Sequence, residues 1–491
     1  MKYADTFLLP FVLLSIFNPV KSQPIWSRLA NPGFENQYIK SAFFFAGNWC
    51  NGMQFYDYKP SDNTGLYTMH PSDFKHLGWS ENIAYRNFVI KSMIDAGVNM
   101  INMSYWGPRG TDNWAYWAPM QTSTYAHDEL FSAAIGKSIL AAPYIESFAA
   151  TDSSDGYSLR DCFPGDSLNP APQLVIMIEE LVDRYLIHPA NARWPEVWAR
   201  AYDQDGTERY IISLIHVASD QTGVNDRSFA QGFDRVANKV LDNTGIHIGF
   251  LLDALPVATY SPGNYKITPE NADAWLSSQK SILGIQCFIP EIWTGFDNDN
   301  DLIAWKRDFA RLWTNTGVPF IMDVSPGYDA HVVFPESMIY GNNHAWRDSL
   351  TQIVKDIKAG GITINTWNGY TEGFAVIPTL EYGDVNYIWA DSLLNQYIIP
   401  GTQSDAENIQ MSESNLFIYP NPVKNDLFIQ SGHGYEGDHI VELYSLRGDL
   451  ISAGELNKDS IFSIRYLSKG VYLLKIKTGS NTVQSIKLIV K

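Results

Sequence analysis

The feature that most constrains the fold is a regular alternation of short apolar runs with amphipathic segments. Strands that alternate with helices form parallel sheets, and eight such units over about 370 residues predict an α/β fold, a (β/α)8 TIM-type barrel with insertions. Eight apolar runs have strand character, at 42–47, 98–103, 139–145, 210–218, 246–252, 282–289, 318–322 and 362–364. Segments with apolar residues at helical spacing separate most of them, around 81–96, 127–136, 172–187, 228–241, 270–279, 302–314 and 346–359.

A doubly wound open sheet is the competing α/β architecture. That fold would place a glycine-rich phosphate turn after its first strand. Here the run 42–47 leads into Asn48 and Trp49 instead. The barrel is therefore the favoured prediction.

The two ends of the chain differ from its middle. Lys2 precedes an apolar run at 7–17, which predicts a secretory signal peptide over residues 1–22. The run is too short to cross a bilayer, and no membrane span is expected elsewhere. After Pro400 a polar stretch at 401–413 predicts a linker, so the barrel domain is expected at 23–400.

The C-terminal residues 414–491 have a different texture. Short runs of strand character, punctuated by turns, predict a small antiparallel β-sandwich that forms a domain of its own. These runs lie at 416–419, 427–429, 440–444, 461–464, 471–477 and 482–490.

Composition excludes several classes of function. The net charge of −18 over 491 residues argues against nucleic acid and against an anionic membrane surface as partners. The three cysteines, Cys50, Cys162 and Cys287, allow at most one disulfide. No metal-binding spacing occurs, so neither a metal nor a cofactor is predicted.

The barrel prediction turns the strand ends into a list of candidate site residues, because the catalytic face lies at the carboxyl ends of the strands. One carboxylic acid that protonates a leaving oxygen and a second carboxylate that acts as base or nucleophile are typical of glycoside hydrolysis. Five carboxylates follow predicted strands: Glu146, Asp253, Glu291, Asp323 and Glu372. The candidates for sugar-binding subsites are Trp49, Tyr105, Trp106, Tyr328, Trp367 and Asn368.

Structural roles remain open for these residues at this point. Asp253 and Asp323 could cap a following helix or pair with a cation. Trp106 and Trp367 could be core residues, although each is flanked by glycine or amide residues. Glu372, in the loop after the last strand, could serve only as a cap or a solvated side chain.

Four motifs within residues 41–390 resemble glycoside hydrolase families 71 and 99. They are AGVNMINMSYW at 96–106, PYIE at 143–146, SPGYDA at 325–330 and WNGYTEG at 367–373. The grouping that the chain resembles most is a glycoside-hydrolase-like family from Bacteroidetes, the domain-of-unknown-function 5010 type. The resemblance implies a barrel that acts on glycans.

The resemblance is incomplete at the last motif. Family 99 enzymes act on α-mannosides with two glutamates from this motif, and the second of them matches Glu372. The first matches Gly369, which has no side chain. Either another carboxylate supplies the missing group, or the barrel binds glycan without cleaving it.

The C-terminal residues resemble a type IX secretion C-terminal sorting domain. The resemblance rests on YPNPV at 419–423, VELYSLRG at 441–448, LSKGVYLLKI at 467–476 and the ending KLIVK at 487–491. It implies export by the type IX secretion machinery to the cell surface or the medium. A carbohydrate-binding β-sandwich is the alternative.

The sequence therefore predicts a secreted or surface-attached glycoside hydrolase that acts on a polysaccharide or glycan. Glu372 is the expected general acid/base. Glu291 or Glu146 is expected to supply the second carboxylate, ahead of Asp253 and Asp323. The alternative is a catalytically inactive barrel that binds glycans at the cell surface.

Overall fold

The computed structural model divides the chain into two units between Thr402 and Gln403. The predicted signal peptide 1–22, the linker 401–413 and most of the helix predicted at 270–279 lie outside the described residues, as do Trp49, Trp106 and Glu146. In the first unit it describes residues 26–45, 68–70, 72, 83–105, 124–145, 172–214, 227–254, 279–288, 290–293, 296–332, 335–357 and 359–396. In the second it describes residues 416–419, 426–431, 439–445, 450–456, 460–465, 467–478 and 481–490.

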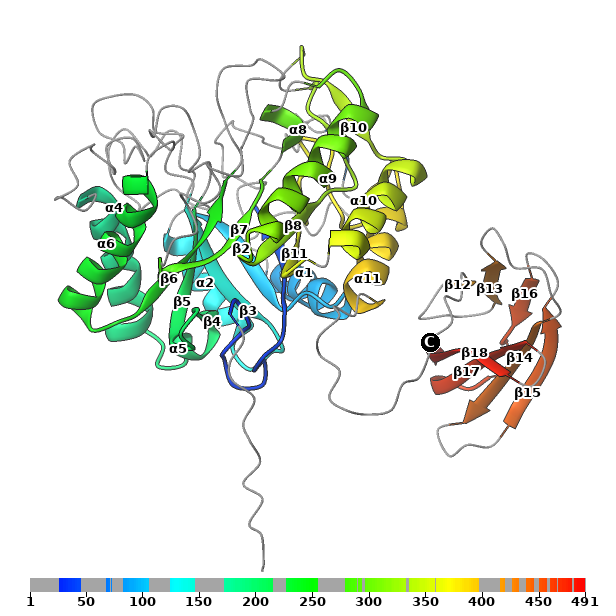
Figure 1. Cartoon of the computed structure of the whole chain (residues 1–491). Helices are drawn as coiled ribbons and strands as arrows, with labels where there is room; N and C mark the ends of the chain where they lie inside the picture. Colours follow the sequence, from blue (N-terminus) through cyan, green and yellow to red (C-terminus); the bar gives the residue numbers. More distant parts are fainter. Residues whose placement is uncertain are drawn as a thin grey trace, which may run out of the picture. The chain divides into compact units, whose positions relative to one another are not determined.

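Eight parallel strands form a closed barrel in the first unit, and the predicted fold is confirmed (Figure 1). Each strand pairs with the next one, β3 pairs with β5, and β11 pairs with β1, which closes the ring. A short strand that the sequence does not predict, β4 (Arg200–Tyr202), runs antiparallel along β5. The barrel strands are β1 (Ile39–Phe44), β2 (Met100–Tyr105), β3 (Leu140–Ile145), β5 (Glu208–Leu214), β6 (Ile248–Asp253), β7 (Ile282–Gln286), β8 (Phe320–Val324) and β11 (Gly361–Ile364).

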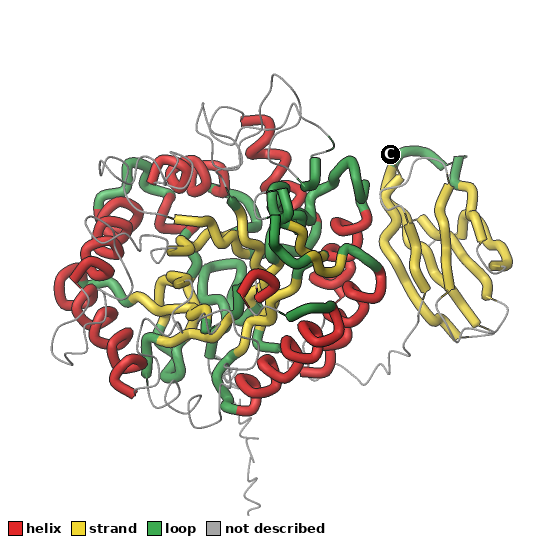
Figure 2. The backbone as a smooth tube through the Cα atoms, turned by 90° about the horizontal axis from the view of Figure 1, so that it is seen from above, coloured by secondary structure: helices red, strands yellow, loops and turns green. Residues whose placement is uncertain are grey.

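Helices surround the strands, as the view in Figure 2 shows. Their apolar stripes face the barrel, which buries one side of each amphipathic helix. The described helices are α1 (Ile83–Asp95), α2 (Thr124–Ala134), α4 (Pro172–Val182), η5 (Asp183–Ile187), α5 (Trp194–Val197), α6 (Arg227–Thr244), α8 (Pro290–Trp293), α9 (Asp299–Asn315), α10 (His344–Ile357) and α11 (Val385–Gln396). None of the helices among the described residues is long and apolar enough to cross a membrane.

The lower part of the barrel interior is apolar. Alternate residues of a strand point inward, and their registers stack them in layers. Leu29, from the segment that precedes β1, packs against this part of the interior. The buried cluster there also contains Ile39, Met100, Leu140, Ile211, Leu251, Leu283 and Ile321.

Polar side chains form the next level of the interior. The Ser41 hydroxyl lies 2.7 Å from that of Thr363, and Asn102 Nδ2 donates to Ser41 Oγ at 3.2 Å. Ser213 Oγ donates to Asn102 Oδ1 at 3.3 Å. All four residues are buried, so the barrel is held by a hydrogen-bonded layer as well as by apolar packing.

The uppermost inward positions lie at the barrel mouth, where the strands end. Phe43 and Tyr144 supply rings 5.1 Å apart, and Phe288 packs 4.6 Å from Phe43. Asp253 and Asp323 face inward two residues beyond Leu251 and Ile321, which belong to the apolar layer. One part of the mouth is therefore aromatic and another part is acidic.

The second unit is an antiparallel β-sandwich, as predicted. A three-stranded sheet is made of β12 (Leu416–Tyr419), β13 (Asp426–Ser431) and β16 (Ser460–Ser463). A four-stranded sheet is made of β15 (Leu450–Leu456), β14 (His439–Ser445), β17 (Gly470–Thr478) and β18 (Asn481–Val490). The sequence does not predict β15, because this strand lies at a sheet edge and exposes Leu450 and Ile451.

Candidate active site

Glu372 lies in the loop after β11, at the carboxyl ends of the barrel strands. Its side chain is partly buried, and Tyr328 Oη donates a hydrogen bond to Glu372 Oε1 at 3.3 Å. Burial raises the pKa of the Glu372 carboxyl to about 7, while the hydrogen bond from Tyr328 opposes this shift. At neutral pH a large fraction of this carboxyl therefore carries a proton that it can donate.

The segment after β8 holds Tyr328 beside Glu372. Strand β9 (Gly327–Asp329) pairs with β10 (Ile339–Gly341), and the Asp329 backbone N–H donates to the Glu372 carbonyl at 2.9 Å. Asn342 joins the two segments, because its N–H donates to the Pro326 carbonyl and its Nδ2 to the Gly373 carbonyl, at 2.9 and 2.8 Å. The two loops thus form one hydrogen-bonded unit.

Two of the predicted carboxylates meet at a buried lysine. Lys306 Nζ, from α9, lies 2.7 Å from Glu291 Oε1 and 2.7 Å from Asp323 Oδ2. Ser325 Oγ donates to Glu291 Oε1 at 2.7 Å, and Asn365 Nδ2 donates to Asp323 Oδ1. We call Glu291, Lys306 and Asp323 the buried triad.

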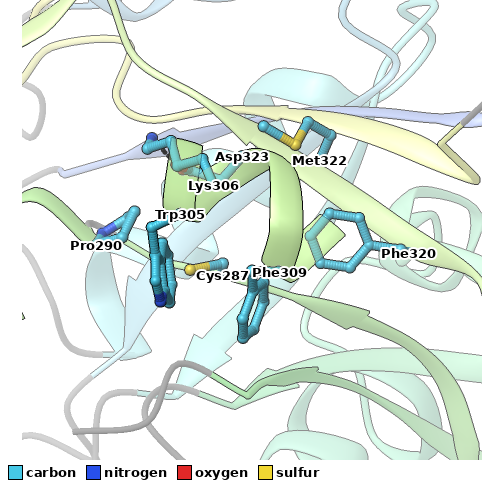
Figure 3. A pocket seen from close by; sticks show the side chains of 8 residues that line it. All are labelled: Cys287, Pro290, Trp305, Lys306, Phe309, Phe320, Met322 and Asp323. Carbon is cyan, nitrogen blue, oxygen red and sulfur yellow. Dashed lines mark hydrogen bonds and ion pairs between the residues drawn. The ribbon is translucent and has the colours of Figure 1, made fainter. Parts of the chain in front are cut away.

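A small pocket lies beside the buried triad, between α9 and the outer faces of β7 and β8. Figure 3 shows Lys306 and Asp323 close together at one end of it, away from Phe309 and Phe320. Cys287 and Met322 also line it. The pocket has room for no more than about one water molecule. It is too small for a sugar.

Burial and neighbouring charges shift the pKa values of Asp323 and Lys306. Burial raises the pKa of Asp323 to about 7, and the charge of Glu291 adds to this, although Lys306 and Asn365 pull it down. For Lys306, burial lowers the pKa, but the two carboxylates outweigh burial and the net shift is upward. One lysine therefore serves two carboxylates and stays charged.

Asp253 occupies a different place from the triad. It is the last residue of β6, is fully buried, and accepts a hydrogen bond from the Phe288 backbone N–H at 3.1 Å. Its position on the inner face puts it in the acidic part of the barrel mouth. Among the described carboxylates, Asp253 and Asp323 reach the mouth directly from strands, whereas Glu291 and Glu372 reach this face from the segments after β7 and β11.

Two predicted sugar-binding residues have other surroundings than an open cleft. Tyr105 points away from the barrel interior, where its ring packs edge-on against His127 of α2 at 5.1 Å. Trp367 is fully buried, donates to Ser92 Oγ of α1 at 3.1 Å, and packs against Tyr387 of α11. Both rings are covered by outer helices, so neither offers a face to a sugar in this structure.

Asn368 uses its side-chain amide on the backbone. Its Oδ1 accepts from the Phe45 N–H at 3.0 Å, and its Nδ2 donates to the Phe45 carbonyl at 2.7 Å. This pair of bonds ties the loop after β11 to the end of β1. Tyr328 is the predicted sugar-binding residue that the structure places in contact with Glu372.

Gly369 has no room for a side chain. A Cβ built there would lie 2.4 Å from Thr366 Oγ1 and 2.7 Å from a ring carbon of Phe374. Real Cβ atoms do not approach so closely, and the Phe374 ring packs against that of Tyr328 at 5.5 Å. The loop conformation is therefore adapted to glycine, and a glutamate at this position would require the loop to rearrange.

Lys306 is not among the residues that the sequence analysis selects for the site, although the sequence carries a signal for it. In α9 it shares the apolar stripe of Leu302, Phe309 and Trp313, so a helical wheel places a lysine on the buried face. A lysine there requires an anionic partner. The described residues contain no cluster of three or more His, Cys, Asp or Glu side chains that fits a metal ion.

Comparisons with known proteins find different relatives for the two units. Residues 417–491 match the family model of the secretion system C-terminal sorting domain. The chain therefore carries a type IX sorting domain, and the protein is secreted or attached to the cell surface. A comparison with curated proteins finds no match for the chain.

The solved structures that resemble this chain include several glycoside hydrolase barrels. One is a family 99 endo-α-mannosidase from Bacteroides thetaiotaomicron, with 14% identity and a TM-score of 0.46, covering 73% of this chain and 96% of that one. A glycoside hydrolase-like protein has 13% identity and a TM-score of 0.47, covering 73% and 94%. A family 5 mannosidase from Rhizomucor miehei has 14% identity and a TM-score of 0.41, covering 65% and 89%. At these identities the likeness concerns the architecture alone.

Proposed function

We propose that the barrel is a glycoside hydrolase in which Glu372 is the general acid. The observation that carries this proposal is the Glu372 carboxyl itself. It lies at the carboxyl ends of the strands, its pKa is raised to about 7, and a tyrosine hydroxyl orients it. A protonated carboxyl at neutral pH is what the departure of a sugar alcohol requires.

The protein's own groups suggest how the reaction would begin. Glu372 donates its proton to the glycosidic oxygen as the bond to the anomeric carbon breaks. The Tyr328 hydroxyl then stabilises the carboxylate that remains, because its hydrogen bond favours the charged form. Departure of the sugar alcohol is thereby coupled to a group that is already placed and oriented.

A second carboxylate is needed to act as nucleophile or base. Glu291 is the member of the buried triad that Ser325 links to the segment bearing Tyr328, and its Oε1 lies 2.7 Å from Lys306 Nζ. Asp253 faces the barrel mouth from the end of β6 and lies outside the triad. We propose Glu291 first and Asp253 second, with Asp323 and Glu146 behind them.

A screen of polysaccharides and glycans with single isosteric variants tests this proposal. The wild-type protein should release reducing ends from at least one glycan, and Glu372→Gln should lose about 10²- to 10⁴-fold of that rate. Glu291→Gln, Asp253→Asn, Asp323→Asn and Glu146→Gln rank the second carboxylate by their losses. Unchanged hydrolysis by Glu372→Gln would remove Glu372 from the role of acid.

A non-catalytic glycan-binding barrel is the second candidate. Two observations favour it. Thr366 and Phe374 fill the space that a side chain at position 369 would need, and Lys306 forms ion pairs with both Glu291 and Asp323. Binding of a glycan by the wild type, with no product after prolonged incubation, would select this alternative.

A further inference from the structure

The segments that follow the barrel strands are strongly acidic. They are the eight stretches 45–82, 106–123, 146–171, 215–226, 254–269, 287–298, 325–343 and 365–384. The described parts of these stretches contain seven Asp and Glu residues and no Lys or Arg; the seven are Glu291, Asp297, Asp329, Glu336, Glu372, Glu381 and Asp384. In a (β/α)8 barrel such segments build the face that carries the active site. A substrate that approaches this face therefore meets a negative potential.

The described part of these segments contains no lysine or arginine. It does contain exposed carboxylates on three different segments, Asp297, Glu336 and Asp384. Two histidines are present, and each lies against a carboxylate: His70 pairs with Glu381, and His331 with Asp329. In this part of the face, a sulfate or carboxylate on a substrate would find no lysine or arginine to pair with.

The lysine of the buried triad is already paired with two carboxylates. Lys306 is 3% exposed and contacts Glu291 and Asp323 at 2.7 Å each. An anionic group that entered the mouth would lose its hydration and gain no opposite charge from this lysine, which is costly. The triad therefore offers an anion no positive charge that is not already paired.

In contrast, the barrel interior contains neutral polar side chains with buried atoms that have no hydrogen-bond partner among the described residues. Gln286 is 2% exposed, and neither atom of its side-chain amide has a hydrogen-bond partner among the described residues. Its register partner is Asp253, so it lies on the inner face of β7. Asn365 Oδ1, at the end of β11, is likewise buried without a partner within the described part of the chain.

These groups match the chemistry of sugar hydroxyls. A side-chain amide offers donors and an acceptor, and a hydroxyl both donates and accepts. Buried amide atoms with unused hydrogen-bonding capacity favour a hydroxylated ligand or water, and they supply no charge for an anion. The acidic face and the neutral interior groups therefore point to the same class of ligand by independent routes.

We propose that the site takes uncharged glycans and excludes glycans that bear carboxylate, sulfate or phosphate groups. This inference rests on the proposed function, because it assigns a substrate class to the same site. The exclusion is electrostatic, so it weakens as salt shortens the distance over which the carboxylates of this face act.

Pairs of polysaccharides that share a backbone and differ in charge test the proposal. The protein without its predicted signal peptide, residues 1–22, is run through native gels that each contain one polysaccharide. The three pairs, with the neutral member first, are hydroxyethylcellulose and carboxymethylcellulose, methyl-esterified and de-esterified homogalacturonan, and agarose and carrageenan. We expect retardation by at least one neutral member. We expect binding of its anionic partner to be weaker by about tenfold or more at low salt, with a smaller difference at about 1 M salt.

A charge variant checks that this face is the cause. The variant that combines Asp297→Asn, Glu336→Gln and Asp384→Asn should bind the anionic polymer severalfold more tightly than the wild type. Its binding to the neutral polymer should be unchanged. The matched control carries Asp242→Asn, Asp308→Asn and Asp356→Asn on the outer helices, where all three side chains are exposed. The control should bind both polymers as the wild type does.

The outcomes separate this inference from the proposed function. Equal or tighter binding of an anionic member overturns the inference, as does the absence of retardation by every neutral polymer. Cleavage of an anionic polymer overturns the inference and leaves the hydrolase proposal standing. Retardation by a neutral polymer without cleavage supports the inference and counts against the hydrolase.

Discussion

Replacing Tyr328 with phenylalanine should move the pH dependence of hydrolysis upward. The hydroxyl donates to Glu372 Oε1 at 3.3 Å and favours the ionised carboxyl, so its removal raises a pKa that already lies at about 7. Hydrogen bonds to charged groups contribute roughly 1.5–3 kcal/mol. Because the hydrogen bond is long and Glu372 is partly exposed, we take its contribution as about 1 kcal/mol. Its loss then raises the pKa of Glu372 by slightly less than one unit.

The assay is the rate of hydrolysis, measured from about pH 4 to about pH 10 on the best substrate of the screen. The general acid must be protonated, so activity falls as the pH rises through its pKa. In Tyr328→Phe this alkaline limb should shift to higher pH. The ring of Tyr328 is buried against Phe374, and phenylalanine keeps that contact.

Tyr340 provides the matched control for this experiment. It pairs with Tyr328 across β9 and β10, and its hydroxyl donates to the Phe296 carbonyl instead of to Glu372. Tyr340→Phe should lower the free energy of unfolding by about 1 kcal/mol and leave the alkaline limb in place. An alkaline limb that stays fixed in Tyr328→Phe, or that moves in both variants alike, would refute the reasoning.

Three further predictions concern stability. The folded-state pKa of Glu372 exceeds the ordinary value of 4.5, so its contribution to stability is complete below about pH 4.5 and is lost as the pH rises through about 7. Glu372→Gln should therefore be more stable than the wild type at about pH 8 by about 1–3 kcal/mol, with little gain at about pH 4, in chemical unfolding. Lys306→Met leaves two buried carboxylates without their cation and should lower the free energy of unfolding by about 3–5 kcal/mol. Adding Glu291→Gln and Asp323→Asn should recover most of this loss. Equal stability of the single and triple variants would contradict the prediction. Gly369→Ala should cost about 1–3 kcal/mol because its Cβ would meet Thr366 at 2.4 Å, and a neutral effect in thermal unfolding would show that the loop adapts.

Sequence periodicity is sufficient to predict the barrel because segments with apolar residues at helical spacing separate most of the eight apolar runs. It locates the strand ends within a few residues, which is why it identifies Asp253 and Asp323 at the mouth. It does not reveal β4 or β15. Both are edge strands, and edge strands lack the two-sided burial that makes a strand visible in a sequence.

Two aromatic residues that their place near strand ends suggests for sugar subsites are buried against outer helices. In β2, Asn102 faces inward, so Ser104 does too and Tyr105 must face the helices. The glycine and amide neighbours of Trp367 suggest an open cleft, whereas the ring is buried between α1 and α11. The period of two along a strand is enough to place Tyr105 on the outer face of β2, because the polar Asn102 and Ser104 occupy the alternate positions.

The partners of the carboxylates cannot be derived from the sequence. Lys306 lies 17 residues from Asp323, on a different element, and what joins it to Glu291 and Asp323 is the packing of α9 against β7 and β8. The Ser325 bond to Glu291 and the Tyr328 bond to Glu372 also depend on loop conformations that no local motif encodes. Long-range geometry sets these contacts.

The central claim is that Glu372 protonates the leaving group, and aryl glycosides of the sugar found in the screen test it most directly. An activated dinitrophenyl glycoside needs no proton to depart, whereas an alkyl or sugar glycoside does. Glu372→Gln should therefore cleave the activated substrate at close to the wild-type rate and lose about 10²- to 10⁴-fold on the unactivated one. Equal losses on both substrates, or no loss on either, would contradict the assignment of Glu372 as the acid.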